Sequence, residues 1–164
     1  MDYPYLQSVE DPWCDCEDSE VLSQVLNDYD LQTRDFHDWK VEYTSEELSS
    51  LIERRTGLSL GEIKELKPLK TGPSGRIISL LVEGTRGSTV LSKELAIRRA
   101  LSESHLKSSA FIVEKTPGGF SLRGKGWGHG VGLCQIGAAV MASKGFDYIQ
   151  ILSHYYAGAK VEKL

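Results

Sequence analysis

The sequence predicts an α+β fold with a small and mostly antiparallel sheet, several helices, and a glycine-rich loop that leads into a C-terminal pair of helices. Three observations support this class. Apolar and polar residues alternate in short runs between residues 63 and 123, which is typical of half-buried strands joined by hairpins. Helix-spaced apolar residues with capping signals flank these runs. Six of the 16 glycines lie between positions 124 and 137, where the last helical patterns begin.

The length of the chain indicates the number of domains, and its charge argues against some classes of function. The chain has 164 residues, enough for one domain with a hydrophobic core, so we expect a single domain over residues 1–164. Apolar residues make up 40% and charged residues 26%, which is ordinary for a globular protein. The net charge of −4, without a basic run, argues against a nucleic-acid partner. No apolar run is long enough to span a membrane, and no signal peptide is recognisable.

Helical periodicity and capping residues predict the helices. We expect them, in order, at residues 20–27, 45–56, 93–101, 131–144 and 147–156. Ser19 and Ser92 are the predicted N-caps of the first and third helices, and Thr44 or Ser45 that of the second. Gly57 is expected to end the second helix. The run His154-Tyr155-Tyr156 is interpreted as packing of the last helix, with one tyrosine hydroxyl hydrogen bonded.

Period-two alternation predicts the strands, at residues 38–43, 63–70, 76–83, 88–91, 110–115 and 120–123. Short turns join the second, third and fourth of these into a meander. The strand at 76–83 is the most apolar and should be central, whereas Pro68 favours an edge position for the strand before it. The last two strands form a hairpin that leads into the glycine segment.

The glycine segment Gly124–Ala139 reads GKGWGHGVGLCQIGAA. Alternating glycines allow positive φ and close approach of another group to the main chain. Its strict alternation does not match the G-x-G-x-x-G pattern of dinucleotide sites. We therefore predict a loop with Trp127 and His129 at the mouth of a helix. The structural alternative is a tight turn in which Trp127 fills a gap in the core and His129 caps the helix.

If the loop is a site, three side chains define it. His129 can exchange hydrogen bonds with a sugar hydroxyl or order a catalytic group, so it is our candidate for a supporting catalytic role. Trp127 offers an apolar face to a sugar ring, and Gln135 offers an amide from the first turn of the helix. The alternative for Gln135 is an ordinary exposed helix residue. The backbone of the loop adds the substrate-binding glycines Gly126, Gly128 and Gly130.

The three cysteines, Cys14, Cys16 and Cys134, cannot form a complete disulfide framework because their number is odd. Cys134 is expected to be a small buried apolar side chain. Cys14 and Cys16, with the distant His129 or Cys134, could hold zinc with one open position. That spacing is not the usual Cys-x2-Cys, so we expect no metal or other cofactor and keep zinc at Cys14 and Cys16 as the alternative.

The glycine segment resembles the signature of the sporulation stage II protein D (SpoIID) / LytB family, also called amidase enhancers. The matching positions are Gly124, Gly126, Trp127, Gly128, His129, Gly130, Val131, Gly132, Leu133, Gln135, Gly137 and Ala138. A second block, residues 3–11 (YPYLQSVED), resembles the family's "pYL.gV.D" segment, and residues 149–159 (IQILSHYYAGA) resemble its closing helix. Cys134 stands where the signature commonly has Ser, and Ile136 where an aromatic is usual.

The resemblance implies a peptidoglycan-binding and remodelling domain that acts outside the cytoplasmic membrane. Family members resemble lytic transglycosylases, which cut glycan strands lacking stem peptides with the help of a catalytic Glu. That Glu lies upstream of the second block, so we expect the natural protein to begin further upstream and this chain to bind glycan without cleaving it. Some relatives are thought to use zinc. The alternatives are a non-enzymatic module that stimulates an N-acetylmuramoyl-L-alanine amidase, and a structural partner-binding domain.

Overall fold

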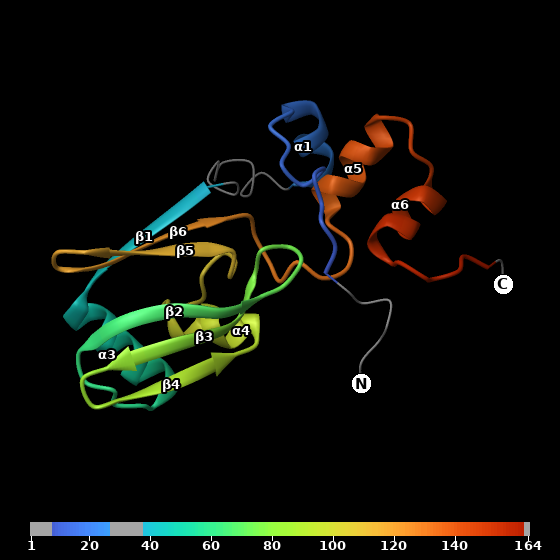
Figure 1. The fold of residues 1–164 in the computed structure, drawn as a ribbon. Coiled ribbons are helices and arrows are strands. Elements are labelled where there is room, and N and C mark those ends of the chain that lie inside the picture. The colour runs from blue at the N-terminus through green and yellow to red at the C-terminus, as the bar shows by residue number, and fades with distance from the viewer. Residues whose placement is uncertain (1–7, 27–37, 163–164) are drawn as a thin grey trace. The chain divides into compact units, whose positions relative to one another are not determined.

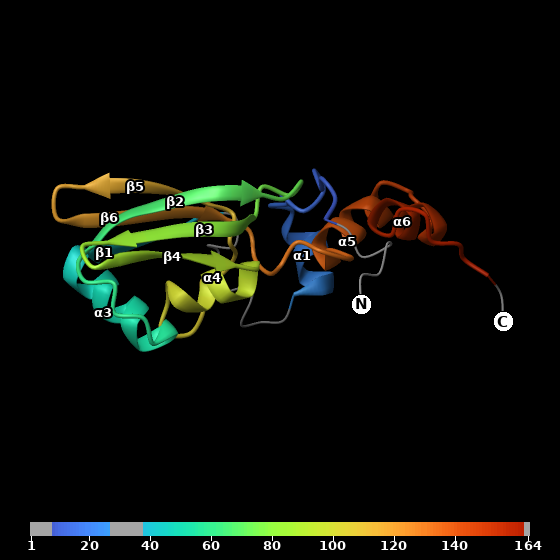
Figure 2. The ribbon, with the colours of Figure 1, turned by 60° about the horizontal axis from the view of Figure 1, so that its bottom comes forward.

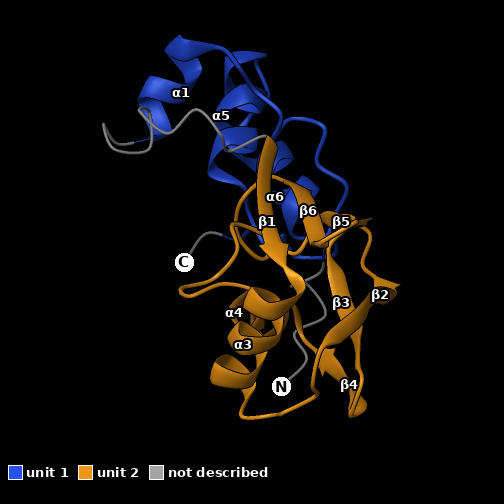
Figure 3. Cartoon of the chain, turned by 90° about the vertical axis from the view of Figure 1, so that its left-hand side faces the viewer, with its two compact units in different colours: residues 1–34, 130–164 blue, residues 35–129 orange. Residues whose placement is uncertain are grey.

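The computed structural model describes residues 8–26 and 38–162 (Figure 1). The chain divides into two compact units, coloured in Figure 3. The sheet unit comprises residues 35–129, and the terminal unit comprises residues 1–34 together with 130–164. The two units are described separately below. The first part of the second family-like block, residues 3–7, lies outside the described residues.

The sheet unit contains two antiparallel three-stranded sheets with two helices, which confirms the α+β class. One sheet has the strand order β1-β6-β5 and the other β2-β3-β4, where the sequence had suggested one small sheet. The strands are β1 (Asp38–Thr44), β2 (Ile63–Thr71), β3 (Ile77–Gly84), β4 (Gly87–Ser92), β5 (Phe111–Thr116) and β6 (Gly119–Lys125).

The meander β2-β3-β4 agrees with its prediction. β3 is the central strand, and its Leu80 and Val82 are completely buried. β2 carries Pro68 and lies at an edge, where a residue without an N–H does not interrupt a ladder. Alternate burial is clear in β3, whereas the buried residues of β2, Ile63 and Leu66, are three apart because the register shifts along this strand.

The second sheet brings the predicted hairpin β5-β6 beside β1. β6 is central, and Trp39 of β1 lies opposite Gly124 of β6. A side chain at position 124 could not be accommodated, because a Cβ there would lie 2.0 Å from the indole of Trp39. Gly124, the first glycine of the segment, thus serves packing.

Helices α3 (Ser45–Thr56) and α4 (Glu94–Ala100) lie side by side beneath the strands (Figure 2). α3 has its predicted bounds. Thr44 forms a complete capping box with Glu47, and Gly57 ends the helix with φ of 74°. The predicted cap Ser92 is wrong: α4 begins after Lys93, which has φ of 74° and gives no side-chain capping bond. Both helices pack on one core shared with the two sheets.

The terminal unit contains α1 (Ser19–Val25), α5 (Gln135–Ser143) and α6 (Tyr148–Tyr155). Its buried cluster consists of Cys16, Val21 and Val140, with Trp13, Leu22, Ile136 and Ala139 packed against it. The N-cap of α1 is Asp18 and not Ser19, because the Asp18 carboxylate accepts from the amides of Glu20 and Val21. Within the described ranges, no helix combines the length and apolar character needed to cross a membrane.

The start of α5 also corrects the sequence prediction. The helix begins at Gln135, four residues later than the predicted Val131. Gly132 has φ of 77°, and Cys134 has an extended backbone, so neither residue continues a right-handed helix. The apolar spacing from Val131 onward indicated a helix correctly but misplaced its first turn.

Candidate functional site

The glycine loop adopts the conformation that its composition predicts. Gly126, Gly128, Gly130 and Gly132 all have φ between 64° and 78°. Residues with a Cβ rarely adopt this left-handed conformation, so the alternation of glycine with other residues is a backbone requirement. The residues between these glycines do not have positive φ, so the sign of φ alternates along the loop.

Trp127 and His129 are both exposed on this loop, with 47% of Trp127 accessible. The alternative in which Trp127 fills the core is therefore wrong. The alternative in which His129 caps the helix is also wrong, because Cys134 is the N-cap of α5 and its sulfur accepts from the Gly137 amide. Two of the three side chains predicted to meet a ligand, Trp127 and His129, are thus exposed.

The backbone of the loop is hydrogen bonded within the sheet unit. The carbonyl of Gly126 accepts from Trp39 Nε1 at 3.3 Å. Arg76 donates from Nη2 to the Trp127 carbonyl and from Nε to the Gly128 carbonyl, both at 3.0 Å. The Gly128 amide donates to the Lys107 carbonyl at 2.8 Å. Gly126 and Gly128 therefore help to hold the backbone of the loop in place.

Gln135 and Gly130 belong to the terminal unit, unlike Trp127 and His129. Gln135 is exposed and is the first residue of α5. The structure thus brings Trp127 and His129 together on one loop of the sheet unit. The grouping of Gln135 and Gly130 with these two side chains remains a prediction.

A polar cluster in the terminal unit was not predicted as a site. Tyr155 Oη donates to Asp11 Oδ2 at 2.9 Å, the Trp13 amide donates to Asp11 Oδ1 at 3.1 Å, and His154 Nε2 lies 3.9 Å from Oδ1. Burial, followed by the bond to Asp11, raises the pKa of the Tyr155 phenol well above its ordinary value. The expected hydrogen bond of one tyrosine in the run 154–156 is confirmed.

This cluster also explains Gly137, a position of the family signature. A Cβ at Gly137 would lie 2.1 Å from Tyr155 Oη and 2.8 Å from Asp11 Oδ2. Asp11 ends the second family-like block and Tyr155 lies in the third, so residues of the three blocks meet here. The sequence showed that each of the three blocks resembles a family segment, but it did not show that they meet.

Cys14 and Cys134 form a disulfide across 120 residues of sequence. The expectation that Cys134 is an isolated apolar side chain is therefore wrong, while Cys16 is buried outside the bridge. Among the described residues, Asp11, Cys14 and Cys134 place possible metal-binding atoms within 4.8 Å of one another. Zinc requires cysteine thiolates, so a disulfide-bonded Cys14 does not fit a zinc site with Cys16 or with Cys134.

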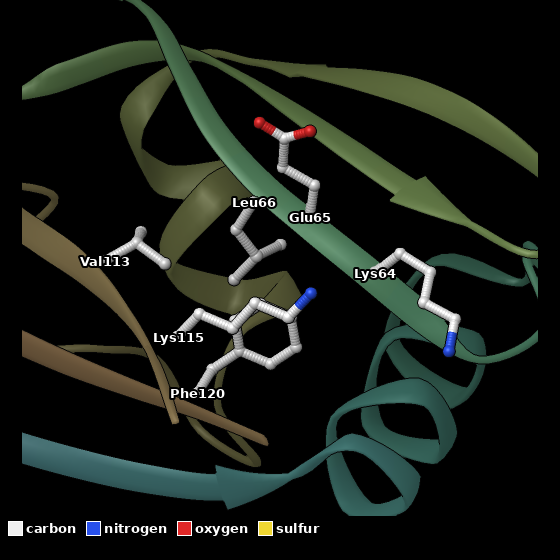
Figure 4. Close-up of a pocket in the computed structure, with 6 residues that line it drawn as sticks. All are labelled: Lys64, Glu65, Leu66, Val113, Lys115 and Phe120. Carbon is white, nitrogen blue, oxygen red and sulfur yellow. The ribbon is translucent and has the colours of Figure 1, made fainter. Parts of the chain in front are cut away.

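A separate hollow of about 300 Å³ lies between β2 and the hairpin β5-β6 (Figure 4). Leu66 and Phe120 form its apolar part, and Lys64 and Lys115 also line it. Glu65 and Val113 complete the lining, which includes none of the predicted site residues. It gives no support to a ligand site beside the glycine loop.

Comparison with protein families gives a match over residues 1–132 to the family described as "Domain of unknown function (DUF8618)". The chain belongs to this family. Curated relatives extend the comparison. The DUF8618 chain is 34% identical to the amidase enhancer of Bacillus subtilis over 88 residues, which are 49% of the chain and 12% of the relative. It is 24% identical to the stage II sporulation protein D of Bacillus amyloliquefaciens over 160 residues, 98% of the chain and 38% of the relative.

An uncharacterized protein of Brachyspira hyodysenteriae is 44% identical over 64 residues, which are 39% of the chain and 17% of that protein. The names of the two Bacillus proteins confirm the resemblance of this DUF8618 chain to the SpoIID/LytB family. The chain spans between 12% and 38% of the length of the curated relatives it matches.

Proposed function

We propose that the chain belongs to a cell-wall protein and that its glycine loop contacts the glycan strands of peptidoglycan. The observation that carries this proposal is the position of Trp127, a large aromatic that is 47% exposed on a hydrogen-bonded loop. An exposed indole on an ordered loop offers a flat apolar surface at little entropic cost. The C–H face of a sugar ring is a natural partner for that surface.

His129 supplies the polar contact in this proposal. Its imidazole is exposed two residues after Trp127, and a neutral imidazole can both donate to and accept from sugar hydroxyls. Gly126, Gly128 and Gly130 set the direction in which the two side chains project. Gln135 is proposed as a further contact from α5.

The reaction class follows from the family resemblance. We propose that the whole protein cuts glycan strands lacking stem peptides, as a lytic transglycosylase does. A carboxylic acid protonates the glycosidic oxygen as its bond to C1 breaks. The 6-hydroxyl of the same sugar then attacks C1 and gives its proton to the resulting carboxylate, which leaves an anhydro sugar. We assign binding to this chain, with His129 supporting, and nominate no acid among its described residues.

An extracytoplasmic location is part of the proposal. The sporulation protein and the amidase enhancer among the relatives suggest action at the cell envelope. The Cys14–Cys134 disulfide supports the same location, because disulfides persist in oxidising compartments and are rare in the cytosol.

The test is an amide NMR titration of the chain with glycan oligomers stripped of stem peptides. We expect shifts clustered at Gly126–Gly130, and loss of these shifts in the Trp127→Ala and His129→Ala variants. Tyr148→Ala and His105→Ala are matched controls, because both remove exposed side chains of similar type outside the loop. The absence of shifts with millimolar wild-type protein and ligand would contradict a glycan site in this chain.

A second candidate function is stimulation of a cell-wall amidase, which the name of the Bacillus subtilis relative favours. In that case the chain would bind an N-acetylmuramoyl-L-alanine amidase and raise its rate without any cleavage of glycan. A rate assay with and without the chain separates the two functions. If Trp127→Ala and His129→Ala change neither glycan binding nor amidase rate and alter only stability, the loop is a structural element of a partner-binding domain.

A further inference from the structure

Arg76 reaches the functional loop from a distant part of the sequence. It directly precedes β3, 51 residues before Trp127, and its guanidinium donates to two successive carbonyls of the loop. The donors are two different nitrogens, Nη2 and Nε, so the contact is a fork that joins the two successive peptide groups on either side of Gly128. A planar fork of this kind fixes orientation as well as distance.

The backbone of Arg76 is itself held on both sides. Its carbonyl accepts from the Gly72 amide at 2.8 Å, closing the turn that leads into β3. The next amide, that of Ile77, donates to the Ser109 carbonyl at 2.9 Å. Because the base of the side chain is fixed by these bonds, its guanidinium is a rigid support for the loop.

The opposite side of the loop is also attached. The Gly128 amide donates to the Lys107 carbonyl at 2.8 Å, and the Lys125 amide donates to the Ala110 carbonyl at 2.8 Å. Ser108 Oγ donates to the carbonyl of Lys125. The segment 107–110 and Arg76 therefore hold the same short stretch of backbone from two directions.

The charge on Arg76 is retained despite partial burial. Burial lowers the pKa of the guanidinium and Arg98 adds to this, while Glu94 raises it. The ordinary pKa of an arginine guanidinium is so far above neutral pH that the group stays protonated. Glu94 lies 3.2 Å from Arg98 Nη1 in an ion pair of its own, so the carbonyls of Trp127 and Gly128 are the hydrogen-bond acceptors that define the direction of the Arg76 fork.

We propose that Arg76 is the positioning residue of the loop, which fixes the two peptide groups between Trp127 and His129 so that the indole and the imidazole project together toward the ligand. The inference rests on the proposed function for the nature of that ligand. Arg76 does not itself have to touch the glycan. Its effect on binding comes through the order of Trp127 and His129, which otherwise have a glycine on each side and would sample several orientations.

The test is the Arg76→Lys variant, which keeps the positive charge but cannot form the planar fork. We expect the backbone order of residues 126–129 to fall in the ligand-free chain, measured by ¹⁵N relaxation, while β3 and β6 keep the wild-type values. Affinity for stripped glycan oligomers should fall about tenfold, the scale of one good hydrogen bond. Arg123→Lys is the matched control, because Arg123 is exposed on β6 and pairs with Glu114.

Two measurements keep this inference separate from the proposed function. Loop order is read without ligand, so a wild-type chain that binds no glycan would overturn the proposed function while the relaxation data still test Arg76. Unchanged order and unchanged affinity in Arg76→Lys would overturn the positioning role. If Arg76→Lys unfolds the sheet unit, the Arg76→Gln variant replaces it in the test, because its amide can donate to one of the two carbonyls. We then expect a partial loss of loop order. Wild-type loop order in Arg76→Gln would overturn the inference.

Discussion

The sheet unit and the terminal unit are stabilised by different means. In the sheet unit, 14 buried apolar residues from both sheets and both helices form one continuous core. Among the described residues of the terminal unit, the corresponding cluster has three buried members. Its distant segments are also joined by the Cys14–Cys134 disulfide, by the hydrogen bond from Tyr155 to Asp11 and by the packing of Trp13 against Phe146. Apolar burial is thus more extensive in the first unit, and specific cross-links contribute more to the second.

This difference suggests how each unit responds to change. A continuous core spreads the effect of a mutation over many contacts, whereas a cross-linked unit depends on single bonds. The loop with Trp127 and His129 is attached to the sheet unit, so the proposed binding surface is carried by the more extensively packed part. The following predictions, from the largest expected effect to the smallest, test that contrast.

The largest effect is expected for Leu122→Ala in the sheet unit. Leu122 is completely buried at the centre of β6, opposite Val41 and Val113. Loss of this side chain should lower the free energy of unfolding by about 2–5 kcal/mol through lost burial and a residual cavity. Residue-resolved hydrogen exchange should show the loss throughout residues 38–125. Leu69→Ala, at a half-exposed position of β2, is the control and should change stability by less than about 0.5 kcal/mol.

The next effect is expected when the disulfide is removed by Cys14→Ser with Cys134→Ser. Closing a loop of 120 residues restricts the unfolded chain, so its loss should cost about 2–4 kcal/mol. The decrease should be largest in the exchange of α1 and α5, which follow the two bridged cysteines in the chain, and smaller in β1 to β6, which can stay folded when the terminal unit opens. Equal losses in both units would contradict the division of roles described above.

The contrast between the units also governs what the sequence could predict. The strands of the sheet unit could be located from apolar alternation, which corresponds to alternate burial at Leu80 and Val82 of β3. The positive φ values of the glycine loop follow from composition, since few other residues tolerate them. The cap at Thr44 follows from a local motif. Each of these features is local in sequence.

The incorrectly predicted or missed features depend on contacts between distant residues or on competing local signals. Cys14 and Cys134 are 120 residues apart, and no property of either residue indicates the other as its partner. Arg76 meets its carbonyls across 51 and 52 residues. The start of α5 was misplaced because its apolar spacing extends back to Val131, whereas the φ of Gly132 decides the outcome. The loop could thus be located from the sequence, but the contacts that support it could not.

The third prediction concerns the tyrosine hydroxyl in each unit. Tyr155 Oη donates to Asp11 in the terminal unit, and Tyr43 Oη donates to the Leu101 carbonyl at 2.6 Å in the sheet unit. Tyr155→Phe should cost about 1.5–3 kcal/mol, since its acceptor is a carboxylate, and Tyr43→Phe about 0.5–1.5 kcal/mol. Urea unfolding at neutral pH, followed by exchange in each unit, measures both losses.

The stability of the chain at alkaline pH also tests the environments of Tyr43 and Tyr155. Burial raises the pKa of both phenols, and the nearby Asp11 and Glu103 raise it further. The neutral forms are therefore favoured by folding, so their contribution is complete below the unfolded pKa of about 10 and is lost as pH rises above it. The wild-type chain should lose stability between pH 9 and 11 more steeply than either Phe variant. The lysines titrate in the same range, but they do so in all three proteins and their effect cancels in the comparison. Parallel curves for wild type and Tyr155→Phe would contradict this linkage.

The smallest effect is expected at two equivalent caps. Thr44 of α3 and Asp147 of α6 both form capping boxes, with Glu47 and Gln150 respectively. Replacing either by Ala should cost about 1 kcal/mol locally. Because α3 buries Leu48, Leu51 and Ile52 in the large core, we expect the loss in Thr44→Ala to appear across the sheet unit.

In α6 the buried residue is Tyr155, so Asp147→Ala should fray the first turn and leave the exchange of α5 nearly unchanged. Asp147→Asn keeps a capping oxygen and is the control, with wild-type exchange in α6. In Thr44→Ala the pKa of Glu47 should also rise, because the hydrogen bonds from Thr44 hold it below its ordinary value, and an NMR titration reads this directly. A loss of hydrogen-exchange protection throughout the terminal unit in Asp147→Ala would mean that α6 is packed as cooperatively as α3. The contrast between the two units would then rest on the disulfide and not on the extent of burial.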